Sequence, residues 1–71
     1  MEYVIVRFEE DRGLIVDGIP QGRTNETLEL EKGVHIIKIQ PPPANFRPES
    51  RRVTLADTSE ESPREVTFEK I

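Results

Sequence analysis

The stretch LIVDGIPQGRT, Leu14–Thr24, carries the strongest fold signal of the chain, because an apolar run leads into an Asp-Gly pair. Asp17 and Gly18 tolerate the two positive φ angles of a type I′ turn, which joins antiparallel strands with a two-residue loop. The chain after the turn is a weak strand, because Pro20 has no amide hydrogen and Gly22 has no side chain to pack. The stretch therefore predicts a β-hairpin whose second arm lies at a sheet edge and then kinks.

The same glycines could instead belong to a phosphate-binding loop. Such loops place their glycines immediately before a helix, whose N-terminal amides then hold the phosphate. Here the chain continues as ETLELE, residues 26–31, which alternates apolar and polar side chains as a strand does. The pattern favours a structural hairpin over a ligand-binding loop.

On both sides of the hairpin, apolar residues recur with a period of two and never with a sustained period of 3.6. Strands are expected at residues 2–9, 13–18, 26–31, 34–40, 51–56 and 64–70. We therefore expect an all-β fold, a small antiparallel β-sandwich of about six to seven short strands, in a single domain of residues 1–71. The expected core consists of Val6, Phe8, Leu14, Val16, Leu28, Leu30, Ile37, Ile39, Val53, Leu55, Val66 and Phe68.

The segments between these strands carry their own signals. EKG at 31–33 has the glycine of a tight hairpin loop, and DTSEES at 57–62 is a polar stretch typical of a hairpin loop at the solvent end. Residues 41–48, PPPANFRP, begin with three prolines that lack amide hydrogens. We expect this segment to cross between sheets or to run along an edge.

Composition limits the range of functions. The chain has 71 residues, no cysteine and a net charge of −4, which opposes the attraction to phosphate backbones on which nucleic-acid binding depends. It has no apolar run of membrane-spanning length, and the acidic Glu2 stands in the region where a signal peptide would be basic. We expect that the protein does not bind nucleic acid and does not insert into a membrane. As the sequence is written, we expect it to be cytoplasmic. If the chain has been excised from a larger protein, a cell-surface or extracytoplasmic location is expected instead.

Catalytic chemistry needs two or three groups within hydrogen-bond reach of one another. The single histidine, His35, shares a strand face with Ile37 and Ile39, so we expect it to pack at a sheet margin with one ring nitrogen bonded. The serines lack a nucleophile-elbow pattern, and the acidic turns lack the ligand spacing of a calcium loop. The sequence predicts no enzyme activity, no catalytic residue, no metal site and no cofactor.

Several residues together resemble the PEGA domain, and they extend over Arg12–Leu55. They are the Asp17-Gly18 pair after an apolar pair, Gly22, Thr24, Leu30, Gly33, His35, Ile37, Ile39, Phe46 and Pro48. The sequence departs from the family by lacking its Pro-x-Gly-Ala and Thr-Pro elements. The resemblance implies a non-catalytic antiparallel β-sandwich, often appended to larger bacterial or archaeal proteins, and it supplies no catalytic residues.

One part of the surface is a candidate for contact with a protein partner. Phe46 stands beside Arg47, Arg51 and Arg52, and aromatic and arginine side chains dominate binding hot spots. In a second interpretation Phe46 fills the open end of the sandwich, and the arginines on the solvent-facing side of the strand at 51–56 pair with nearby glutamates. The alternative function is a small carbohydrate- or ligand-binding module that stacks its ligand on Phe46 and Tyr3. Charged and proline-broken edges predict a monomer.

Overall fold

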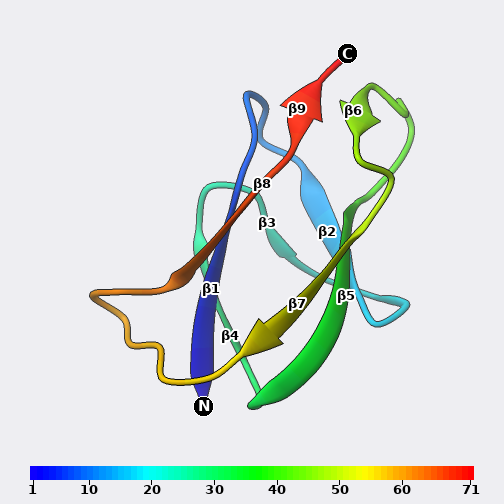
Figure 1. Ribbon diagram of the computed structural model, residues 1–71. Helices are drawn as coiled ribbons and strands as arrows, with labels where there is room; N and C mark the ends of the chain where they lie inside the picture. Colours follow the sequence, from blue (N-terminus) through cyan, green and yellow to red (C-terminus); the bar gives the residue numbers. More distant parts are fainter.

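The computed structural model describes residues 1–71 as strands and connecting loops without a helix (Figure 1), so no helix could span a membrane. The all-β prediction is confirmed. Nine strands follow one another: β1 (Glu2–Arg7), β2 (Gly13–Val16), β3 (Ile19–Arg23), β4 (Thr27–Leu30), β5 (Gly33–Ile39), β6 (Phe46–Arg47), β7 (Arg51–Leu55), β8 (Arg64–Thr67) and β9 (Glu69–Lys70).

The strands form two main sheets that enclose the core and a short pair near one end. One sheet has the order β4-β1-β8, the other has the order β3-β2-β5-β7, and β6 pairs with β9. Figure 1 shows β6 and β9 at the end where the C-terminus lies, whereas the N-terminus is at the opposite end. All pairs are antiparallel except β1 and β8, which run parallel. The expectation of antiparallel pairing therefore fails for this one pair.

Both sheets contribute apolar side chains to one core. All but one of the expected core residues are buried there; Leu28 is only partly buried and packs against the others. The structure adds Val4 and Phe46, which are 0% and 8% exposed. Ile5 is also buried, although it lies on the other face of β1 from Val4. Sequence alternation thus locates most of the core, and Ile5 shows that the first strand is covered on both faces.

The first hairpin forms as its sequence predicts. Asp17 and Gly18 have φ values of 52° and 82°, both positive as a type I′ turn requires. The return arm β3 is the outermost strand of its sheet, and every residue in it is exposed. Gly22 is needed there, since a Cβ atom on it would lie 3.0 Å from the Leu28 side chain and its φ is 76°.

The other two predicted hairpins are wrong. The EKG turn at 31–33 joins β4 to β5, and the loop at 57–62 joins β7 to β8, but in each case the two strands belong to different sheets. A turn signal shows that the chain reverses without showing whether the flanking strands share hydrogen bonds. Of the two expectations for residues 41–48, a crossing between the two main sheets is wrong, because β5 and β7 on either side of them are neighbours in one sheet. The end of the segment instead forms β6, which pairs with β9 outside the main sheets.

A polar corner carries the chain from β3 in one sheet to β4 in the other. Thr24 is 1% exposed; its hydroxyl donates to the Glu10 carbonyl at 2.6 Å and accepts from the Arg12 amide at 2.8 Å. Asn25, with φ 64°, bonds both backbone groups of Phe8 through its side-chain amide. These bonds satisfy polar backbone groups beside the core and fix the crossing.

Candidate functional site

Phe46, the centre of the predicted contact region, is a core residue. Its ring makes edge-to-face contacts with Phe8 and Phe68, with centroid separations of 6.4 Å and 6.1 Å. Since the side chain is 8% exposed, it cannot offer a partner an apolar surface. The hypothesis that Phe46 contacts a partner is therefore wrong, and its ring instead packs in the core, as the second interpretation expects. The alternative carbohydrate function loses one of its two stacking platforms for the same reason.

Arg12 fastens the proline-rich segment to the rest of the fold. Its guanidinium donates to the carbonyl oxygens of Gln40 and Pro43 at 2.8 Å each and to the Asn45 side chain at 2.8 Å. It also lies 5.9 Å from the Phe46 ring centroid, within the range of a cation–π contact. The Arg12 side chain is 11% exposed, and its bond to Asn45 is partly buried, whereas the two carbonyl oxygens lie in exposed residues. Nothing in the sequence signals this role, because an arginine before a strand is ordinary.

The three predicted contact arginines do not form one cluster. The register of β5 and β7 pairs Arg51 with Ile37, whose side chain is in the core, and Arg52 with Ile36, whose side chain is exposed. Arg51 and Arg52 therefore lie on opposite faces of β7. Arg47 comes from β6 and joins Arg51 on the same side of the molecule, whereas Arg52 belongs to a separate surface.

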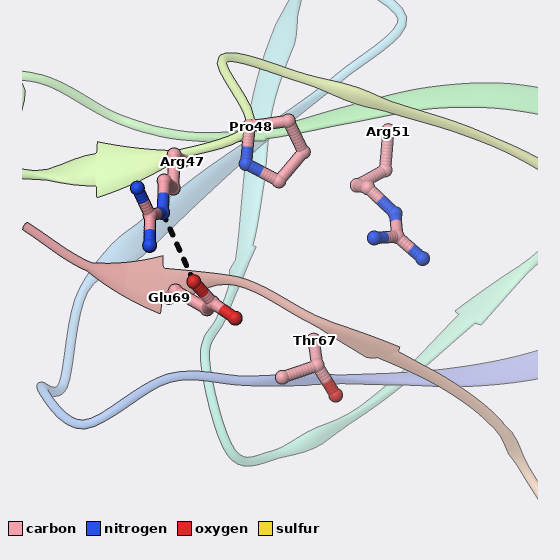
Figure 2. A pocket seen from close by; sticks show the side chains of 5 residues that line it. All are labelled: Arg47, Pro48, Arg51, Thr67 and Glu69. Atoms are coloured by element: carbon pink, nitrogen blue, oxygen red, sulfur yellow. Dashed lines mark hydrogen bonds and ion pairs between the residues drawn. The ribbon is translucent and has the colours of Figure 1, made fainter.

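Arg47 and Arg51 line a hollow of about 430 Å³ together with Pro48, Thr67 and Glu69 (Figure 2). The hollow lies between the first residue of β7 and the last residue of β8, which are edge strands of the two main sheets. The β6–β9 pair contributes Arg47 and Glu69 to it. The site thus occupies the open seam where the two sheets do not pair.

The two arginines of the hollow differ in their bonding. Arg47 Nε donates to Glu69 Oε2 at 2.9 Å, and both side chains are about two-thirds exposed. Arg51 forms no ion pair, and neither does Arg52. The predicted pairing of the arginines in the strand at 51–56 with glutamates is therefore wrong, and the ion pair is made by Arg47 instead. The hollow therefore contains the unpaired guanidinium of Arg51 and the guanidinium of Arg47, whose charge is neutralised by Glu69.

Tyr3 lies in a second hollow on the three-stranded sheet, with Thr27, Glu29 and Glu60. The negative charge of Glu29 and the neighbouring Glu60 raise the pKa of the Tyr3 hydroxyl. Tyr3 is only half-buried and is surrounded by carboxylates. This hollow would repel an acidic ligand, which separates it chemically from the arginine-lined one.

His35 links the first hairpin to the turn between β4 and β5. Its Nδ1 lies 2.6 Å from Asp17 Oδ2, and its Nε2 lies 2.7 Å from the Glu31 carbonyl oxygen. Both partners can only accept hydrogen bonds, so the doubly protonated imidazolium satisfies both. The bond to Asp17 and the bond to Glu31 raise the pKa of His35. We expected one ring nitrogen to be hydrogen-bonded, but the structure shows that both are. Both nitrogens of His35 therefore serve a structural role.

The raised pKa makes stability depend on pH. The imidazolium contributes fully below about 6.5, the pKa expected in the unfolded chain, and its contribution disappears as pH rises through the higher folded value. We expect His35→Gln to lower the melting temperature more at pH 5.5 than at pH 8.5. Thermal unfolding followed by circular dichroism at both pH values measures this difference. An equal loss at the two values would show that His35 is not charged in the folded protein.

A control for this pH effect is Asp17→Asn, which removes the carboxylate that accepts from His35. The bond from the Ile36 amide and the bond from His35 lower the pKa of Asp17, so this carboxylate stays ionised across the tested range. Asp17→Asn should therefore lose the larger part of the pH-dependent component that His35→Gln loses, because the bond from His35 to the Glu31 carbonyl oxygen remains. The hydrogen bonds of Asp17 to His35 and to the Ile36 amide hold the hairpin turn in place, so the Asp-Gly turn has a structural role that requires no ligand.

Comparison with known proteins gave no match to this chain among protein-family models, curated proteins or solved structures. The resemblance to the PEGA domain stays a prediction from the residues that carry it.

Proposed function

We propose that the chain is a non-catalytic module that binds an acidic protein partner through Arg47 and Arg51, at the end formed by residues Pro41–Arg52. The main support is the unpaired guanidinium of Arg51 in a hollow that also holds the Arg47–Glu69 pair. The resemblance to PEGA domains supports the same class of function, since it implies an accessory module of larger bacterial or archaeal proteins.

The chemistry of the hollow favours a carboxylate over other groups. A guanidinium presents a planar fork of donors that matches the two oxygens of a carboxylate. Arg51 can make this bond without breaking an existing ion pair. Nucleic acid could also offer oxygens to arginine, but the net charge of −4 disfavours a long phosphate backbone, whereas a short acidic peptide needs only this local site.

The ordering of the segment supports a binding role at this end. Arg12 and Phe46 already fix the chain on both sides of the proline run, so the partner does not have to order it. Preordered surfaces lose less conformational entropy on binding than mobile ones. Arg47 and Arg51 are therefore held on a fixed frame although their own side chains are exposed.

The test is titration with N-acetylated tetra-aspartate by isothermal calorimetry at low ionic strength. We expect weak, salt-sensitive binding, since exposed ion pairs contribute only about 0.2–1 kcal/mol each. Arg51→Glu should weaken it by about tenfold, because it replaces attraction with repulsion.

Arg64→Glu is the matched control, since Arg64 is also exposed and unpaired but lies at the far end of β8 from Thr67. It makes the same change in net charge. If Arg64→Glu weakens tetra-aspartate binding as much as Arg51→Glu does, the effect is one of overall charge and the proposed site is wrong. Equal binding of tetra-lysine would contradict it as well.

A further inference from the structure

The outer face of the four-stranded sheet has apolar side chains that no other layer covers. Val34 and Ile36 alternate along the central strand β5 and are 49% and 42% exposed. Ile15 on the neighbouring strand β2 is half-buried and lies on the same face, because it pairs with Lys38 two residues after Ile36. The three side chains form an apolar strip along β5 and β2.

Two cations border this strip. Lys38 lies opposite Ile15, and Arg52 lies opposite Ile36, so both extend on the outer face. Neither makes an ion pair. The nearby carboxylate of Asp17 is already bound to His35 and to the Ile36 amide. A positive, apolar face therefore stands on a protein whose net charge is −4.

We propose that this outer face is a second docking surface, separate from the Arg47–Arg51 hollow, and that it receives an amphipathic helix with acidic residues beside its apolar stripe. We define the outer face by Ile15, Val34, Ile36, Lys38 and Arg52. The inference does not depend on the proposed function of the hollow.

The charges and the shape of the outer face select this occupant. Lys38 and Arg52 complement carboxylates, and charge complementarity fixes the orientation of a bound partner. The apolar side chains form a narrow strip, which suits the single apolar stripe of an amphipathic helix, and helices commonly cover the open face of a sheet. An anionic membrane is a poorer occupant, because two cations attract it weakly and the rest of the chain is acidic.

The probe for the experiment is a synthetic helix-forming peptide with leucine at i, i+3, i+4 and i+7 spacing and glutamate at most other positions. It is titrated into isotopically labelled protein while backbone amide chemical shifts are recorded. The expected result is saturable shifts at the residues of the outer face. The double variant Lys38→Glu/Arg52→Glu should bind at least about tenfold more weakly, because it places like charges against the peptide.

Two controls distinguish binding at the outer face from binding at the hollow. Arg51→Glu should leave binding of the leucine–glutamate peptide unchanged, whereas Lys38→Glu/Arg52→Glu should leave tetra-aspartate binding changed by less than about threefold at moderate salt. Circular dichroism shows whether the double variant is folded. A further variant, Val34→Thr/Ile36→Thr, tests the apolar strip with no change of charge and should also weaken binding of the peptide.

The proposal is overturned if the peptide causes no saturable shifts at millimolar concentration, if the shifts lie elsewhere, or if a leucine–lysine peptide binds equally well. Two other outcomes would also overturn the proposal, because each would show that something other than an acidic amphipathic helix binds the outer face. One is binding to vesicles containing anionic lipid but not to the peptide. The other is a concentration-dependent dimer of the protein whose shifts map to the outer face in place of peptide binding.

Discussion

Phe46→Ala is expected to remove much of the stability of this domain. The ring packs edge to face between Phe8 and Phe68 and is 8% exposed, so its truncation leaves a cavity in the core. Loss of a buried phenylalanine costs about 3–5 kcal/mol. In a domain of this size such a loss lowers the melting temperature by at least about 12 °C. Thermal unfolding followed by circular dichroism provides the measurement.

Phe46→Leu is the matched variant, because it keeps an apolar side chain in the same cavity and should cost clearly less than alanine. Arg52→Ala, on the exposed outer face, should change the melting temperature little. If Phe46→Ala instead unfolds within about 3 °C of the unaltered protein, a loss of under 1 kcal/mol, the ring does not close the core and its role as a contact residue has to be reconsidered.

Arg12→Met is expected to destabilise the domain next most strongly. The change keeps most of the apolar length of the side chain but removes the donors that reach Gln40, Pro43 and Asn45. It also removes the ion pair with Glu10. Hydrogen bonds to charged groups contribute about 1.5–3 kcal/mol, and the Arg12 side chain that makes these is 11% exposed. We expect a melting temperature lower by about 6 °C or more, together with faster amide hydrogen exchange between residues 41 and 48.

Arg23→Met is the control for Arg12→Met, since it makes the same chemical change at an arginine that is half-exposed and bound to Asp11. It should lower the melting temperature only slightly, because exposed ion pairs add little to stability. Equal effects of the two variants would mean that the bonds of Arg12 to the proline-rich segment do not hold that segment in place.

The sequence predicts where the strands lie, but it does not predict which strands pair with one another. The period-two alternation of residues such as Leu28 and Leu30 depends on one buried face, a local property, so the strands and most of the core could be predicted. Which strands pair depends on contacts distant in sequence, and a turn such as EKG at 31–33 is compatible with a hairpin or with a change of sheet. The two-residue strands β6 and β9 are too short for any period to show.

The candidate site could be predicted only in part for the same reason. Arginines near Phe46 are visible in the sequence, but the division of Arg51 and Arg52 between two faces follows from the register of β7 on β5. The partner of Arg47 is Glu69, which is 22 residues away in sequence and reaches it through the β6–β9 pair. The role of Arg12 likewise rests on bonds to residues 28 to 33 positions away.

The sharpest test of the proposed binding module is to map tetra-aspartate onto the isotopically labelled protein by chemical shifts. Binding at the hollow predicts saturable changes at Arg47, Arg51 and Thr67, with Tyr3 and the second hollow unaffected, and the loss of these changes in Arg51→Glu. Changes spread evenly over all lysine and arginine residues, or no changes near the hollow, would contradict it.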